Sequence, residues 1–315
     1  MKSGIGRARL RVCTLLFVCY LAGCATSPQI RRLLDDPPDI PPRMELTEVP
    51  FFPQQEYHCG PAALAGVMNY LGVDVMPDQI ADLVYVPGLK GSLQVEVVAA
   101  ARQFDLLPVE LDGSLESLLR EVAADNPVFL LQNLGLDIYP VWHYEILIGY
   151  DLEQRLVILR SGVNRRITRS FFTFEQTWQR AGRWALVIVN ADSIPVSSSA
   201  DGYLDAVIGM EQVGSVKIAR QAYTTALRRW PENALALGGL GNSAYALGDY
   251  AAAERAYRAV LALDPARAEV WNNLAYALIQ LGKRESALAA IARARLLDPG
   301  NSNYLDSQSE LDNWP

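Results

Sequence analysis

The stretch that decides the fold reads Gln54-Gln55-Glu56-Tyr57-His58-Cys59-Gly60-Pro61-Ala62-Ala63-Leu64-Ala65. Small and apolar residues follow Cys59, and Pro61 stands near the start of this run, where the missing N–H of proline removes no helical hydrogen bond. The pattern predicts a helix over 59–71 that begins at Cys59. Unpaired N–H groups and the helix dipole stabilise an anion at such a position. We therefore expect a lowered pKa for the Cys59 thiol, whose thiolate is the attacking form.

The chain contains two histidines, and either could accept the thiol proton as general base. His58 is the direct neighbour of Cys59, and side chains of neighbouring residues diverge at the start of a helix. His143 opens a predicted strand over 143–150, in which Tyr144 and Ile146 alternate with Glu145 and Leu147. A strand end can present an imidazole edge-on to a helix tip, so we favour His143 as the base.

A family resemblance combines these two segments. The second segment reads His143-Tyr144-Glu145-Ile146-Leu147-Ile148-Gly149-Tyr150-Asp151. Together with residues 54–65 it resembles the papain-like cysteine peptidases that remove double-glycine leaders from bacteriocins, and their stand-alone relatives. The resemblance covers residues 47–190 and implies an α+β papain-like fold, with Cys59 as nucleophile and His143 as base. It further implies that a glutamine before the cysteine helps to form the oxyanion hole, with Gln54 as the best match and Gln55 as the fallback.

One departure from the family pattern concerns the residue that orients the histidine. The family usually carries Asp-Pro at the end of the strand that follows the histidine strand, whereas this chain has Leu159-Arg160-Ser161-Gly162 there. Ser161 or Asn164 could orient the imidazole by a hydrogen bond instead, as an asparagine does in papain. The sequence does not decide between them.

The N-terminus has the features of an export signal. A positively charged start with Lys2, Arg7, Arg9 and Arg11 precedes an apolar stretch over 12–22, which is too short to span a bilayer. The stretch ends in Leu21-Ala22-Gly23-Cys24, which resembles the lipobox of bacterial lipoproteins. The resemblance implies a signal peptide over 1–23 and a lipidated Cys24. Because Ala25 is not the aspartate that retains such proteins at the inner membrane, we expect the periplasmic side of the outer membrane.

Cysteine usage then isolates one thiol. Cys13 and Cys19 would leave with the signal peptide and Cys24 would carry the lipid, so Cys59 would be the only free thiol of the mature chain. A single unpaired cysteine in an exported protein is either buried and inert or the reactive group.

The remaining sequence divides into two domains. Residues 24–46 are polar and rich in proline, which favours an extended tether. A domain over 47–191 follows, with helices predicted first, over 59–71, 77–84, 92–104 and 114–124, and strands afterwards, over 128–132, 143–150, 156–159 and 184–189. This order is typical of the α+β class. Residues 192–201 are predicted to form a linker.

The C-terminal part is a repeat array with a period of 34 residues. Three sets of identical residues recur at this spacing, one residue in each repeat. They are Pro231, Pro265 and Pro299; Gly214, Gly248 and Gly282; and Ala219, Ala253 and Ala287. Period and residue types resemble tetratricopeptide repeats. We expect three all-α repeats over 202–299, a C-terminal cap over 300–315, and a concave surface for a protein or peptide partner.

Charge and composition limit the function classes. The formal net charge is -7, which gives no electrostatic reason to bind nucleic acid. No residues have metal-ligand spacing, and we expect no cofactor. The leading hypothesis is a lipid-anchored periplasmic cysteine peptidase that cleaves amide bonds. A catalytically quiet scaffold lipoprotein and an enzyme that transfers an acyl group to an acceptor other than water are the alternatives.

Overall fold

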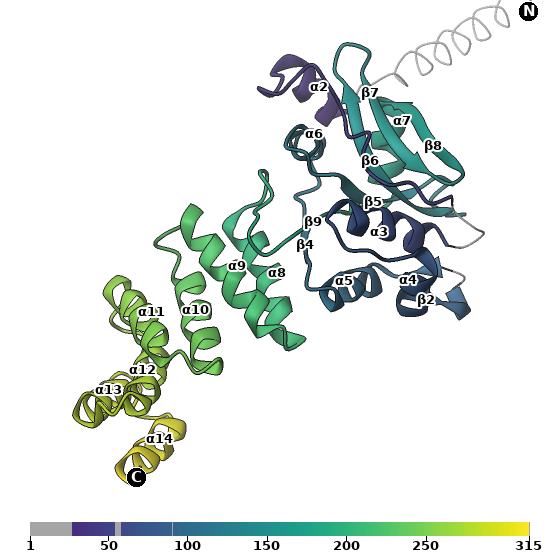
Figure 1. The fold of residues 1–315 in the computed structure, drawn as a ribbon. Helices are drawn as coiled ribbons and strands as arrows, with labels where there is room; N and C mark the ends of the chain where they lie inside the picture. The colour runs from purple at the N-terminus through teal and green to yellow at the C-terminus, as the bar shows by residue number, and fades with distance from the viewer. Residues whose placement is uncertain (1–26, 54–57, 90, 315) are drawn as a thin grey trace, which may run out of the picture.

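The structure is a computed structural model that describes residues 27–53, 58–89 and 91–314. An N-terminal part of helices and one large antiparallel sheet is followed by an array of helices that extends away from it (Figure 1). This arrangement confirms the predicted fold class, α+β followed by all-α. The predicted signal peptide, Cys24, Gln54 and Gln55 lie outside the described residues.

The large sheet has seven strands, and each strand pair in it is antiparallel. Six of the strands follow the order β4-β9-β5-β6-β7-β8, and β1 pairs with β6 at its C-terminal end. Their bounds are β1 (Arg43–Glu45), β4 (Leu107–Glu110), β5 (Val128–Asn133), β6 (Trp142–Asp151), β7 (Leu156–Ser161), β8 (Asn164–Ser170) and β9 (Ala185–Val189). A separate small sheet joins β2 (Tyr85–Val86) and β3 (Gly91–Ser92).

Helices cover both faces of the large sheet. They are α2 (Pro28–Asp35), α3 (Cys59–Tyr70), α4 (Pro77–Val84), α5 (Gln94–Gln103), α6 (Leu115–Ala123) and α7 (Phe171–Gln179), with a short 3-10 turn over Pro87–Leu89. Helix α3 lies against the face that carries Ile146, because a Cβ at Gly66 would stand 2.9 Å from that side chain. Helix α7 lies on the opposite face, where Thr177 donates a hydrogen bond to Gln132.

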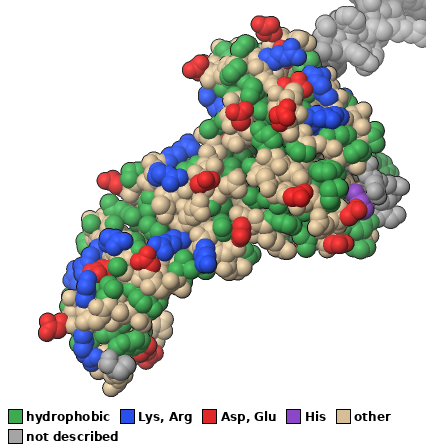
Figure 2. Space-filling view, viewed as in Figure 1, with side chains coloured by type: hydrophobic (Ala, Val, Ile, Leu, Met, Phe, Trp, Pro, Cys, Tyr) green, Lys and Arg blue, Asp and Glu red, His purple; other side chains and the backbone are tan. Residues whose placement is uncertain are grey.

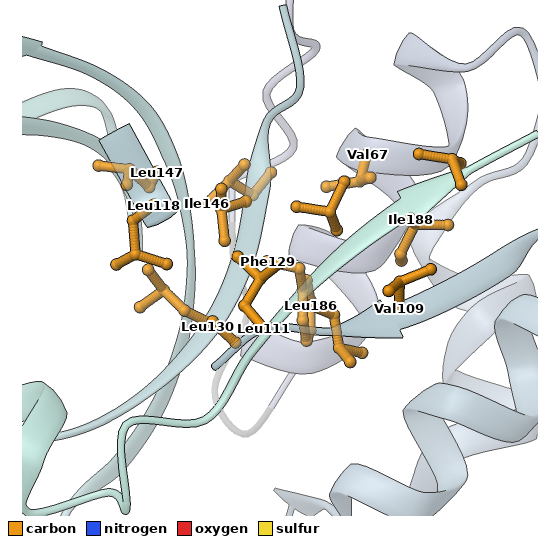
Figure 3. Close-up of a cluster of buried hydrophobic side chains, with 14 of the residues drawn as sticks. Val67, Val109, Leu111, Leu118, Phe129, Leu130, Ile146, Leu147, Leu186 and Ile188 are labelled. Atoms are coloured by element: carbon orange, nitrogen blue, oxygen red, sulfur yellow. The ribbon is translucent and has the colours of Figure 1, made fainter. Parts of the chain in front are cut away.

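The core of this part is built from both layers. In Figure 3, Val67 of α3 lies on one side of the cluster, and Leu118 of α6 lies next to Leu147 of β6 on the other. The strands β5 and β9 are buried along their whole length, as expected for central strands covered by helices on both faces. The core therefore holds α3 firmly against the middle of the sheet.

The C-terminal array consists of paired antiparallel helices. Their bounds are α8 (Ala200–Gln212), α9 (Val216–Arg229), α10 (Ala234–Ala246), α11 (Tyr250–Leu263), α12 (Ala268–Gln280), α13 (Arg284–Leu297) and α14 (Ser302–Asp312). The recurring glycine stands in the turn within each pair, with φ angles of 83°, 79° and 71° for Gly214, Gly248 and Gly282. Only glycine adopts this left-handed conformation without strain, which explains its recurrence.

The first repeat shares its core with the sheet-containing part. One hydrophobic cluster runs from the sheet through α8 and α9 to Ala236 at the start of α10, and a second cluster begins at Ala244 of the same helix. Residues expected to form a linker are also held in place, because Arg229 donates hydrogen bonds to the carbonyls of Pro195 and Val196. The two parts are therefore joined by packing as well as by the chain.

The segment over 24–46 differs from the extended tether that its composition favours. Within its described residues, Pro28–Asp35 forms α2, whose Ile30 and Leu33 are buried, and Arg43–Glu45 pairs with β6 as β1. Ile30 and Leu33 are three residues apart and so share one helix face, and proline at the first helical position favours the helix start. Tertiary burial of this short apolar face outweighs the proline-rich composition.

The surface has no large region of one charge on the face seen in Figure 2, where acidic and basic side chains are interspersed over the sheet-containing part and the helical arm. Within the described ranges, no helix has the length and apolar character needed to cross a bilayer.

Candidate active site

Cys59 is the first residue of α3, as the sequence predicts. Its side chain is partly buried, so the sulfur is neither fully exposed nor sealed in the core. Burial raises the pKa of the thiol, although hydrogen bonds from the backbone N–H groups of Tyr144, Gly60 and Cys59 oppose this rise. The expected lowering of the pKa is therefore wrong for the resting site, because desolvation outweighs the helix N-terminus.

The sulfur lies at the edge of β6. Its hydrogen bond to the backbone N–H of Tyr144 places it beside the residue that follows His143 in the chain. The other histidine is engaged elsewhere, since the ring of His58 packs edge-on against Tyr85 with 5.4 Å between ring centroids. The sulfur thus lies beside the strand end that bears His143, while the ring of His58 packs against Tyr85; the assignment of His143 as the base stays a prediction.

His143 stands at the start of β6, and its side chain is 17 % exposed. Its Nε2 lies 3.1 Å from the hydroxyl of Ser161 at the end of β7. If the Ser161 oxygen accepts from Nε2–H, Nδ1 is the ring nitrogen that can accept a proton from a thiol. Burial lowers the pKa of His143, so the neutral imidazole, which is the form that can act as a base, dominates at neutral pH.

Glu145 completes the arrangement and is the residue that sequence reasoning missed. Ser161 donates a hydrogen bond to its Oε1, which also lies 3.6 Å from Nε2 of His143. Its Oε2 accepts a hydrogen bond of 2.6 Å from the amide of Gln132, which in turn accepts one from Thr177. Burial raises the pKa of Glu145 to about 7. The spacing could have revealed it, because residues two apart on a strand share one face.

The other sequence candidates take different places. Of the two alternatives for orienting the ring, Ser161 contacts His143, whereas Asn164 is exposed and pairs with Ser161 only through the β7–β8 hairpin. Asp151 accepts a hydrogen bond from the backbone of Gln154 at the far end of β6, as a turn residue does. The structure therefore places His143 in contact with Ser161, and the Cys59 sulfur at the backbone of Tyr144, the residue after His143.

These groups can perform one kind of chemistry. A thiol within reach of a neutral imidazole can lose its proton to that imidazole as it attacks a carbonyl carbon. The N–H groups at the start of α3 stand beside the sulfur, where they can stabilise a thiolate or an adjacent oxyanion.

Comparisons with known proteins agree with this architecture. Residues 46–186 match the model of the Peptidase_C39 like family, and residues 211–253 and 244–311 match two models of tetratricopeptide repeats. No curated protein gives a significant match to the sequence.

Among solved structures, a putative C39-like peptidase from Bacillus anthracis is 21% identical, with 47% of this chain and 97% of that chain covered and a TM-score of 0.40. The second TPR domain of the human RPAP3 protein, solved in complex with an HSP70 peptide, is 23% identical, with 36% of this chain and 95% of that chain covered and a TM-score of 0.35. The chain thus carries a domain of the Peptidase_C39 like type, followed by tetratricopeptide repeats.

Proposed function

We propose that the chain is a cysteine peptidase that cleaves peptide or amide bonds, with Cys59 as nucleophile and His143 as general base. The observation that carries this proposal is the position of the Cys59 sulfur at the tip of α3, beside the strand end that bears His143. The match of residues 46–186 to a peptidase family supports it.

The reaction follows from the two side chains. The Cys59 thiol gives its proton to Nδ1 of His143 as the sulfur bonds to the substrate carbonyl carbon, and the oxyanion forms beside the backbone N–H of Cys59. The carbon–nitrogen bond then breaks, and the leaving amine takes the proton from His143. Water, deprotonated by His143, hydrolyses the thioester and restores the thiol. A second oxyanion donor from Gln54 remains a prediction.

The test uses the full-length chain and a mixture of peptides of diverse sequence. We expect new peptide termini, detected by mass spectrometry, with the wild type, and none with Cys59→Ala. His143→Ala should lower the cleavage rate by about 100-fold or more, because general-base catalysis contributes about that factor. Equal peptide patterns with wild type and Cys59→Ala would overturn the proposal.

A binding function without catalysis is the second candidate, and one observation favours it. Burial raises the pKa of Cys59 and lowers that of His143, so the resting pair is neutral rather than a reactive thiolate–imidazolium pair. In that case the C39-like domain and the repeats both serve binding. The peptide mixture separates the two candidates, because a scaffold would bind peptides without producing new termini.

The repeats, in this proposal, recruit a protein or peptide partner. A small pocket lined by Asn242, Tyr245, Tyr257, Asn273 and Tyr276 lies between α10, α11 and α12. Tyrosine and asparagine side chains offer apolar area together with hydrogen-bonding groups, which suits a peptide. The rigid packing of the first repeat on the C39-like domain would keep a bound partner at a fixed distance from Cys59.

Anchoring is proposed from the sequence alone. Cys24 would carry a lipid that holds the chain on the periplasmic side of the outer membrane. Wild-type protein from cells should partition into the detergent phase, and its peptide that begins at Cys24 should show the mass increase of an attached lipid. Cys24→Ser should be found in the soluble fraction. A wild-type chain that retains residues 1–23 would contradict the anchor.

A further inference from the structure

Ser161 stands where peptidases of this type usually carry a carboxylate that orients the histidine. Its hydroxyl contacts His143 and Glu145. Glu145 is 4% exposed, and within the described part of the chain the basic side chain within ion-pair distance of it is His143, whose imidazole carries a charge only when protonated. A buried carboxylate costs several kcal/mol of stability unless hydrogen bonds or an opposite charge compensate it. An apolar side chain would fill the same place without this cost, so the carboxylate calls for a functional explanation.

The hydrogen bonds around the ionised form of Glu145 have a fixed direction. An ionised carboxylate only accepts, so the hydroxyl of Ser161 and the amide of Gln132 must both donate to it. A serine hydroxyl has a single proton. Because that proton is directed at Glu145, the oxygen of Ser161 can only accept from Nε2–H of His143. The imidazole is therefore held as the Nε2–H tautomer, and the lone pair on Nδ1 is available.

We propose that Ser161 and Glu145 are positioning residues for His143: the buried carboxylate acts through the Ser161 hydroxyl to fix the tautomer that accepts the Cys59 proton. The inference rests on the proposed function of the Cys59–His143 pair and gives it a third and a fourth member. The carboxylate also stabilises the imidazolium that forms when the proton arrives, since it lies 3.6 Å from Nε2.

The path of hydrogen bonds from Glu145 through Ser161 to His143 is called the relay below. Protonation of Glu145 would reverse the direction of these hydrogen bonds. A protonated carboxyl can donate to Ser161, whose own proton is then free to point at Nε2, and this selects the Nδ1–H tautomer, which cannot accept from a thiol. The titratable or charged groups that act on this site are His143 on the same strand, Arg169 on β8 and Cys59 at the start of α3. The relay is therefore expected to operate on the alkaline side of the Glu145 transition.

The test measures alkylation of Cys59 by iodoacetamide in the full-length chain, followed by peptide mass spectrometry so that other cysteines do not contribute. At pH 8 we expect Glu145→Gln and Ser161→Ala each to slow alkylation by about tenfold or more. Ser161→Thr keeps the hydroxyl and should react within about threefold of wild type. The double variant Ser161→Asp with Glu145→Gln places a carboxylate directly beside Nε2 and should recover most of the lost rate.

A purely electrostatic or structural role gives the opposite result. The charge of Glu145 raises the pKa of Cys59, so its removal without any relay would increase the thiolate fraction and speed alkylation. One result would overturn the relay and leave the catalytic pair intact. In it, His143→Ala reacts slowly, whereas Glu145→Gln and Ser161→Ala both react as fast as the wild type or faster. Unchanged alkylation in His143→Ala would overturn the pair, and the relay with it. Ser161→Ala removes only a hydroxyl, which keeps the test informative if Glu145→Gln misfolds.

Discussion

Two neighbouring glycines in α10 offer a matched test of how the repeats pack. A Cβ at Gly239 would stand 2.2 Å from the ring of Tyr223, whereas a Cβ at Gly238 would meet no atom within 4 Å. The Tyr223 ring is 1% exposed, and its hydroxyl donates to Glu211 over 3.0 Å. The ring must move by more than 1 Å to admit a methyl group, and it would lose this hydrogen bond.

The expected magnitude follows from these contacts. Overpacking of a core costs about 1–3 kcal/mol, and loss of the hydrogen bond adds about 1 kcal/mol. Replacing glycine by alanine within a helix contributes about 1 kcal/mol of stability at either position, so this gain cancels when the two variants are compared. Gly239→Ala should therefore be about 2–4 kcal/mol less stable than Gly238→Ala, and Gly238→Ala should be slightly more stable than wild type.

Urea unfolding followed by circular dichroism measures this difference through the transition midpoints. The core that contains Tyr223 also contains the sheet, so alkylation of the partly buried Cys59 thiol should become faster over the same range of urea concentration. If the two variants unfold within about 0.5 kcal/mol of each other, the packing of Tyr223 on Gly239 is not as described.

Two further predictions concern the C39-like part, and a third concerns the first helix of the repeats. The pKa of Glu145 rises from its ordinary 4.5 to about 7 on folding, so the wild type loses stability as the pH increases through that window. Glu145→Gln cannot titrate there. Between pH 4.5 and pH 7.5 its free energy of unfolding, measured in urea, should therefore gain up to about 3 kcal/mol relative to that of the wild type. Gly149→Ala would bring a Cβ to 2.6 Å from the carbonyl of Met44, and should loosen β1, which faster amide hydrogen exchange at Met44 would report. Ser199→Ala removes the side chain that caps α8 and should lower stability by about 1 kcal/mol in thermal unfolding.

The sequence was informative where the signal is local or periodic. The helix that begins at Cys59 follows from its small residues and Pro61, and the strand of His143 follows from alternation. The repeats follow from a period that three sets of residues share, and Gly248 with φ of 79° shows the physical reason for one of them. The predicted fold class is confirmed for the same reason, since local patterns decide which elements form.

Sequence reasoning failed where distant contacts decide the structure. Helix α2 and strand β1 lie in a segment whose prolines favour an extended chain. Both form hydrogen bonds with residues more than 80 positions away. Strand β4, with only four residues, was not predicted because it is short and contains Pro108. Helix α7 was missed because aromatic and β-branched residues in Phe171–Gln179 resemble a strand pattern.

The site shows the same limit. Cys59 and His143 could be chosen from residue type and position, but their pKa shifts depend on burial, which reversed the expected direction for Cys59. The alternating pattern of the strand predicts no special role for Glu145. Its role depends on Ser161 and Gln132, which come from two other strands, and pairing of distant strands is not visible in one sequence.

The central claim is that His143 activates Cys59, and a peptidyl vinyl sulfone tests it most directly. The Cys59 sulfur adds to the vinyl group of this electrophile, and His143 gives the proton to the adjacent carbon, so a thioether forms. The probe therefore detects an activated thiol even when the substrate is unknown. The intact mass of the wild-type chain should increase by one probe at Cys59, and His143→Ala should remain unmodified over the same time. Equal modification of both chains, or modification only at other cysteines, would contradict the claim.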